Sequence, residues 1–284
     1  MMSENLNNLK SVLDKVAKDN HFIKHQLHFE NGSEAGFIGL MKRCKIIEGD
    51  KILSVMCKFL PKDPEHNQKF FTHQLFEREV FVYKNLFPEL EKIQLEHGLL
   101  PKDEFGFWAF PQYYYAHFDV TNVENSLIVM EDLGERSFEM KDKFIPVDFE
   151  HTQRVFQELG KLNAVGYALN KKKPDIFEQF KSMNDLICKV MTTEALKDVA
   201  PRNCQLASEI FKNENEQKFK KLMISYKSNL WEEMEKLAIG IEPFGTLNHG
   251  DCWINNIMYN YQDAEKKNIK EICIVEWQCF GVWA

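Results

Sequence analysis

The feature that most limits the possible folds is a change of residue pattern near Gly134. Before this point, short aliphatic and aromatic runs alternate with polar turns, a pattern typical of β-strands. Beyond it, apolar residues recur at helical spacing in four segments, 149–170, 175–194, 203–213 and 215–240. A strand-like run returns only at 269–277. This order favours an α+β fold, with a mostly β half followed by a mostly helical half.

The first half also contains two helical patterns. Residues 6–18 predict an amphipathic leading helix, and residues 75–90 predict a longer one. The apolar face of the second helix carries Phe76, Val80, Tyr83 and Phe87. Strands are expected within 36–61, on both sides of the turn-forming Glu48-Gly49-Asp50, and within 105–119 and 126–135.

The join between the two halves falls at Met130–Gly134, which divides residues 1–130 from residues 131–284. Two parts that meet at one short connection leave a cleft between them, where small ligands usually bind.

Charge and cysteine usage restrict the partners and the compartment. The 284 residues include 43 acidic and 36 basic side chains, a formal charge of −7, which argues against nucleic acid or an anionic membrane as the main partner. Seven scattered cysteines without a CxxC pair indicate reduced thiols. The sequence shows neither a signal peptide nor a membrane-spanning run. We therefore expect a cytoplasmic protein.

The segment LNHGDCWINN, residues 247–256, is the most unusual polar stretch of the chain. Phosphoryl transfer needs a carboxylate that accepts the proton of an attacking hydroxyl, and oxygen ligands for Mg²⁺. Asp251, Asn256 and Glu276 could fill these roles in order, with His249 bracing the loop through hydrogen bonds. The same residues also suit a polar turn between two strands, because His-Gly-Asp by itself is a weak signal.

Lys58 is a charge on an otherwise apolar strand, LSVMCKFLP. A buried lysine requires a partner, and Glu79 in the following helix could provide one and leave the ammonium facing phosphates. The alternative is a lysine at a strand end that extends to water. Gly32, Gly36 and Gly39 could cradle phosphates with their backbone amides or simply form a turn.

Taken together, these segments resemble the ecdysteroid kinase-like family, also called CHK kinase-like, which is related to choline kinases and aminoglycoside phosphotransferases. LNHGDCWINNIMYNY is similar to the catalytic loop of that family, and the Trp two residues after the Asp and the doubled Asn are more specific to this branch than His-Gly-Asp alone. Further matches follow in the expected order: VMCKFLP, FEREVFVYKNLFPEL, FPQYYYA, LIVMEDLGE and LGKLNAVGYAL. The resemblance covers roughly residues 30–280.

This resemblance implies a two-lobed protein-kinase-like fold. Residues 1–130 would be a β-rich N-lobe that binds the nucleotide, and residues 131–284 an incomplete, mostly helical C-lobe that carries the catalytic loop. It also implies roles for single residues: Lys58 on the ATP phosphates, Glu79 anchoring Lys58, Asp251 as catalytic base, Asn256 and Glu276 as metal ligands, and backbone around Met130, Glu131 and Leu133 on adenine. The cofactors would be ATP and Mg²⁺.

Three departures from the family pattern stand out. Glu276 occupies a position where the family usually has Asp, and Mg²⁺ tolerates little deviation from octahedral geometry. Asn163 stands where the family usually has His. The family usually continues into further helices, so we expect the apolar segment CFGVWA, residues 279–284, to lie partly exposed.

Two functions therefore stay open. The first is an ATP-dependent kinase that phosphorylates a hydroxyl of a small acceptor, with a steroid-like molecule as one candidate. The second is a truncated kinase-like protein without catalysis, which acts as a binding or interaction module.

Overall fold

The computed structural model describes residues 2–30, 34–35, 40–61, 63–101, 103–182, 189, 193–194, 197–238 and 245–283. Gly32, Gly36 and Gly39, which the sequence suggested as a phosphate cradle, lie outside these residues.

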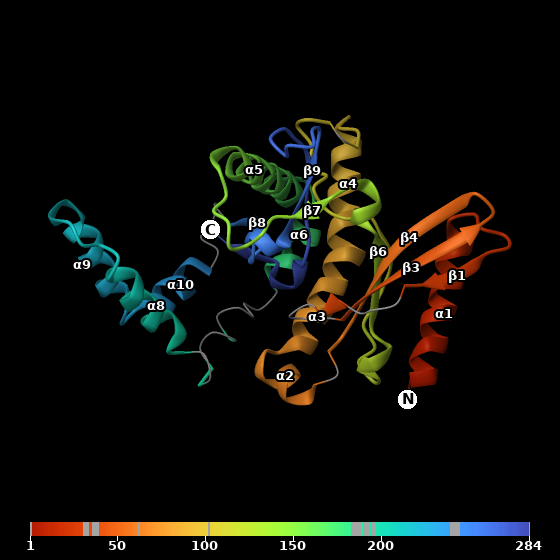
Figure 1. Ribbon diagram of the computed structural model, residues 1–284, viewed down its shortest axis with the longest axis horizontal. Helices are drawn as coiled ribbons and strands as arrows, with labels where there is room; N and C mark the ends of the chain where they lie inside the picture. Colours follow the sequence, from red (N-terminus) through yellow and green to blue (C-terminus); the bar gives the residue numbers. More distant parts are fainter. Residues whose placement is uncertain are drawn as a thin grey trace.

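An antiparallel sheet forms the first half of the chain, in the strand order β1-β3-β4-β6-β5, with the short β2 also paired with β3 (Figure 1). Its strands are β1 (Gln26–Phe29), β2 (Glu34–Ala35), β3 (Leu40–Glu48), β4 (Lys51–Phe59), β5 (Tyr113–His117) and β6 (Leu127–Glu131). β3 and β4 form the predicted hairpin, and Gly49 in its turn has the positive φ that glycine adopts readily. Within the predicted strand 105–119, only β5 is extended and paired.

Alternation along β4 separates two faces of the sheet. Val55 and Cys57 point to one face, where they pack against the apolar side of α1 (Met2–Asp19). Met56 and Lys58 point to the other face, toward the larger core. The leading helix is confirmed, and its apolar residues pack against one face of the sheet.

The second face is covered by a long helical run. It comprises α2 (Pro64–Lys69), α3 (Thr72–Phe81), a π-helical turn (Val82–Leu86) and α4 (Phe87–Glu96). The predicted helix over 75–90 is thus longer than expected. The π turn precedes Pro88, which cannot donate a helical hydrogen bond, and Phe87 donates its N–H five residues back to Val82. The predicted apolar face is confirmed, since Phe76, Val80, Tyr83 and Phe87 are all buried.

The helical half begins with α5 (Phe149–Lys172) and α6 (Pro174–Lys181), followed by α8 (Val199–Ser208), α9 (Gln217–Tyr226) and α10 (Leu230–Ala238). The prediction of one helix over 215–240 is wrong: the chain breaks after Tyr226, and Asn229 accepts the first hydrogen bond of α10 from Glu233. The helix predicted at 203–213 begins and ends earlier, at Val199 and Ser208, and Asn213 instead forms a capping box with Glu216 at the start of the next helical segment. Most of the predicted helix beyond Ser182 lies outside the described residues.

Short strands complete the second half, and the sequence predicted only one of them. β7 (Glu139–Met140), β9 (Ile257–Tyr261) and β10 (Ile269–Ile274) form one sheet, and β8 (Thr246–Asn248) pairs with β11 (Gly281–Trp283). The expectation of an exposed end segment is wrong for Phe280 and Val282, which are 0% and 8% exposed. β11 buries them beside β8 and α6.

Close contact between α5 and β8 depends on Gly166. A Cβ atom there would lie 2.6 Å from Thr246 Oγ1. Asn163 reinforces the contact. Its side-chain nitrogen donates to Leu247 O at 2.8 Å, and its backbone carbonyl accepts from Thr246 Oγ1 at 3.0 Å. Asn163 therefore fastens the strand that leads into the LNHGDCWINN segment.

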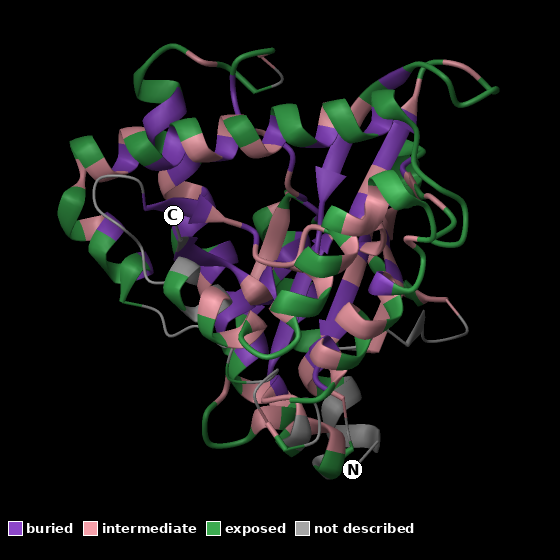
Figure 2. Cartoon of the chain, turned by 90° about the vertical axis from the view of Figure 1, so that its left-hand side faces the viewer, coloured by how far each residue is buried: buried purple, intermediate pink, exposed green. Residues whose placement is uncertain are grey.

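Figure 2 shows that buried residues gather on the strands and on the inward sides of the helices. Six of the cysteines lie in the described part of the chain and all six are free thiols, as the sequence predicted. Among the described residues, no helix combines the length and the apolar character needed to cross a membrane.

We predict that Phe87→Ala lowers the free energy of unfolding by about 3–5 kcal/mol, because it opens a cavity in an aromatic cluster. The Phe87 ring stacks on Phe110 at 4.2 Å between centroids and meets Tyr83 and Trp277 edge-on, each at 5.1 Å. Chemical denaturation would measure the loss. Phe149→Ala is the matched control, since that side chain is exposed, and equal losses in the two variants would contradict the prediction.

Candidate functional site

The centre of the candidate site is a buried ion pair that joins three distant parts of the chain. Lys58 Nζ on β4 lies 2.6 Å from Glu79 Oε2 on α3 and 2.9 Å from Glu276 Oε2, which follows β10. Lys58 and Glu79 are each 1% exposed, whereas the side chain of Glu276 is 25% exposed. The alternative in which Lys58 extends to water is therefore wrong, and Glu79 is its partner.

Charge pairing keeps Lys58 protonated. Burial by itself lowers the pKa of Lys58, but the nearby carboxylates of Glu276 and Glu79 outweigh it and raise the pKa above its ordinary value. The ammonium group therefore remains a fixed positive charge, and Glu276 forms the edge of the cluster that solvent reaches.

Glu276 is held in an unusual backbone conformation. Its φ of 65° lies in the left-handed region, which is uncommon for a residue with a side chain and costs on the order of 1–3 kcal/mol. Trp277, the next residue, is fully buried, and its indole N–H donates to Ile274 O at 2.8 Å. Arg78 on α3 donates to Phe280 O at 2.9 Å, which ties the same segment to the helix that carries Glu79.

Asp251 and Asn256 contact one another within the loop between β8 and β9. The Asn256 side-chain nitrogen donates to Asp251 O at 2.8 Å and to Asp251 Oδ2 at 3.1 Å. Asp251 is half-buried, and burial raises its pKa; Asn256 opposes this shift and Glu276 adds to it. The loop is thus held by internal hydrogen bonds, and the side-chain amide of Asn256 orients the carboxylate of Asp251.

His249 braces this loop, as predicted. Its Nε2 lies 2.9 Å from Val275 O, and its Nδ1 accepts the Asp251 N–H at 3.3 Å. The two contacts suit the neutral tautomer with the proton on Nε2. Burial lowers the pKa of His249 to about 4, so the ring stays neutral at physiological pH. His249 therefore links the loop to the residue before Glu276.

The connection after β6 is the third part of the site. Met130 is buried on the sheet face that also carries Lys58, and Glu131 exchanges hydrogen bonds with Gln112. Leu133 begins a 3₁₀ turn (Leu133–Arg136), which Asp132 caps by accepting the Gly134 N–H. Met130 and Glu131 lie at the end of β6, which is paired with the strand that carries Lys58.

The donor atoms suit a magnesium ion that is shared with phosphates. Asn256 uses its side-chain nitrogen on Asp251, which leaves the amide oxygen for a cation, and Glu276 contacts Lys58 through only one of its oxygens. In the described part of the chain, no cluster of three His, Cys, Asp or Glu side chains could hold a metal. Mg²⁺ commonly binds through one or two protein ligands plus phosphates and water, so the set present fits.

The sequence did not reveal the contacts of Arg43, Ser54 and Asp132. Arg43 and Ser54 lie on neighbouring strands, and both donate to Asp132 in the connection. The only signal was an acidic residue directly after Glu131 in an apolar strand, and its partner lies 89 residues away.

Comparison with protein families identifies the chain. The model of the ecdysteroid kinase-like family matches residues 34–282, which is most of the sequence. The chain belongs to the ecdysteroid kinase-like family. The match includes every site residue described above, from Arg43 to Glu276. The comparison with curated proteins found no similar sequence.

Membership agrees with the fold. An antiparallel sheet followed by a mainly helical part is the α+β arrangement of a kinase-like protein, as the sequence predicted. The family indicates a kinase-like phosphotransferase for small molecules.

We predict that His249 makes stability depend on pH. An unfolded histidine has a pKa of about 6.5, whereas the folded His249 has a pKa of about 4. Its contribution to stability is therefore present above pH 6.5 and is lost as pH falls toward 4. The loss amounts to about 3 kcal/mol.

Urea denaturation of wild type and His249→Gln at several pH values tests this. The variant should start less stable at pH 7 and lose less stability on acidification. Parallel curves for the two proteins would contradict the prediction.

Proposed function

We propose that this ecdysteroid kinase-like protein is an ATP-dependent kinase that phosphorylates a hydroxyl group of a small acceptor in the cytosol. The observation that carries the proposal is the meeting of Lys58, Glu79 and Glu276 on one face of the sheet. Kinase-like proteins need a lysine held by a glutamate and an acidic residue beside it to bind nucleotide and metal. A steroid-like molecule is one candidate for the acceptor.

Lys58 would contact the phosphates of ATP. Its ammonium is already held by Glu79, so the side chain needs little further ordering when phosphates arrive. Backbone groups around Met130, Glu131 and Leu133 would hold the adenine ring at the other end of the nucleotide.

Asp251 would accept the proton of the acceptor hydroxyl. A base is most effective when its pKa is closer to the working pH, and burial shifts the pKa of Asp251 upward, in that direction. Asn256 orients the carboxylate through Oδ2, while the other carboxylate oxygen remains for the hydroxyl.

Asn256 and Glu276 would hold Mg²⁺. When bound, the ion supplies positive charge against the phosphate oxygens. Asn256 presents an amide oxygen and Glu276 a carboxylate oxygen. The two segments are joined next to these residues, where the Val275 N–H donates to Asn256 O at 2.9 Å.

A second candidate is a kinase-like protein that binds a ligand without catalysis. One observation favours it: Glu276 is longer than the usual Asp, and its carboxylate already contacts Lys58 at 2.9 Å. If that contact persists when nucleotide arrives, Glu276 cannot turn fully to the metal.

We predict that Asp251→Asn lowers kcat by about 10²–10⁴-fold, because the amide cannot accept the hydroxyl proton. The affinity for ATP with Mg²⁺ should change little, since Asp251 is not expected to bind the nucleotide. ATP-dependent thermal stabilisation, with and without Mg²⁺, measures binding. A phosphate-transfer assay against a panel of steroid and amino-alcohol acceptors measures turnover.

Asp50→Asn is the control, because that aspartate is exposed at the β3–β4 turn. Equal turnover by wild type and Asp251→Asn would exclude Asp251 as the base. Binding of ATP without transfer to any acceptor would favour the second candidate.

A further inference from the structure

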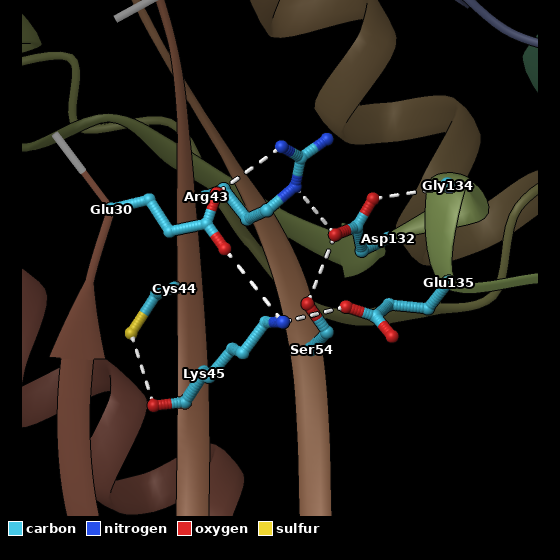
Figure 3. Close-up of polar contacts among 8 residues, drawn as sticks. All are labelled: Glu30, Arg43, Cys44, Lys45, Ser54, Asp132, Gly134 and Glu135. Carbon is cyan, nitrogen blue, oxygen red and sulfur yellow. Dashed lines mark hydrogen bonds and ion pairs between the residues drawn. The ribbon is translucent and has the colours of Figure 1, made fainter. Parts of the chain in front are cut away.

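Asp132, within the connection between the two halves, accepts an unusual number of hydrogen bonds. Its carboxylate is 3% exposed. It accepts from Arg43 Nε at 2.6 Å, from Ser54 Oγ at 2.9 Å and from Gly134 N at 3.1 Å, as Figure 3 shows. Its own N–H donates to Ser54 O at 3.2 Å. One residue thus joins β3, β4 and the 3₁₀ turn.

A second layer of charges surrounds this cluster. Lys45 lies 2.8 Å from Glu135 and 3.7 Å from Glu30, and Arg43 also reaches Glu30 at 3.3 Å. These outer side chains are 30–50% exposed, so water and salt weaken their attraction. Asp132 itself is buried, so its charge-assisted contacts with Arg43 and Ser54 are the stronger constraint.

The strand register places this cluster on the same face of the sheet as Lys58. Every second side chain of a strand points to the same face, so Ser54, Met56 and Lys58 share one face of β4. Arg43 on β3 lies directly opposite Met56 and therefore belongs to that face. Ser54 and Lys58 are four residues apart, about 13 Å along a strand. The cluster and the Lys58 ion pair thus lie at the two ends of one stretch of strand, with Met56 between them.

We propose that Arg43, Ser54 and Asp132 are positioning residues that fix the connection at 130–133 relative to Lys58 and so set the affinity for the adenosine half of the nucleotide. The inference rests on the proposed function. The carboxylate of Asp132 is occupied by its hydrogen bonds with Arg43, Ser54 and Gly134. Asp132 therefore acts by fixing the backbone of the connection and does not contact the ligand. A connection that is already ordered loses less conformational entropy when adenine binds.

The experiment separates the two ends of the site. Adenosine probes the connection alone, and tripolyphosphate with Mg²⁺ probes the Lys58 end alone. Isothermal titration calorimetry with each ligand is carried out on wild type, Ser54→Ala, Arg43→Lys and Arg43→Met. We expect adenosine to bind about fivefold more weakly to Ser54→Ala, and more weakly still to Arg43→Met. Arg43→Lys should fall between wild type and Arg43→Met, and tripolyphosphate affinity should stay within about twofold in all variants.

Lys45→Met is the matched control, since Lys45 lies on the same strand and face, but its ammonium group forms ion pairs with the exposed Glu30 and Glu135 rather than a hydrogen bond with Asp132. It should leave both affinities unchanged. Thermal unfolding establishes which variants are folded at the titration temperature, and Ser54→Ala keeps the test decisive if Arg43→Met does not fold.

The possible outcomes are distinct. Unchanged adenosine affinity in folded Ser54→Ala and Arg43→Lys overturns this inference but not the proposed function. An equal loss of affinity for adenosine and for tripolyphosphate does the same, because it indicates a general structural role. A wild-type protein that binds neither ligand overturns the proposed function and this inference together.

Discussion

The arrangement of the molecule depends on one buried charge, the ammonium group of Lys58. An unpaired ammonium in a protein interior is strongly unfavourable, so β4 can bury this residue only if carboxylates reach it. Glu79 and Glu276 do so from α3 and from the segment after β10. Removing one partner of a buried ion pair typically costs about 3–5 kcal/mol. The contact therefore restricts how the sheet, the helix and the end of the chain are placed.

Aromatic packing determines where the second carboxylate lies. Trp277 is fully buried and contacts the rings of Phe87, Phe107 and His249. Glu276, one residue earlier, must then turn through the left-handed region to leave the core and face Lys58. The apolar contacts of Trp277 offset the cost of that conformation. A position in the candidate site is thus set by the hydrophobic core beneath it.

Local patterns predicted those features that depend on neighbouring residues. The apolar neighbours of Lys58 in LSVMCKFLP raised the expectation of a buried, paired lysine, the spacing from Phe76 to Phe87 predicted a helix with one apolar face, and the polar loop grouped Asp251 with Asn256. Contacts between distant segments left no such pattern. The pairing of β11 with β8, the bond from Arg43 to Asp132, and the second partner of Lys58 each join residues that lie far apart in the chain.

The same limit explains the errors at helix and strand ends. The π turn before Pro88 and the break before Asn229 depend on single residues inside otherwise helical patterns. Exposure of the end segment was expected because further helices usually follow it in the family, whereas β8 and α6 already pack against β11, and Phe280 and Val282 are buried. The close approach of α5 to β8 likewise depends on a single residue, Gly166, where a Cβ atom would lie 2.6 Å from Thr246 Oγ1.

Charge balance at Lys58 connects the fold to the chemistry. One ammonium lies between two carboxylates, so the cluster is attractive to a cation and unattractive to phosphates alone. Glu276 contacts Lys58 through one oxygen, so the metal-binding role proposed above would fall to its second oxygen while that contact persists. Mg²⁺ held by Asn256 and Glu276 would supply positive charge in addition to that of Lys58, and the contact between Lys58 and Glu79 would not need to break. The extra methylene of Glu276 is then compatible with phosphoryl transfer as long as the backbone turn at this residue, which Trp277 fixes, stays in place.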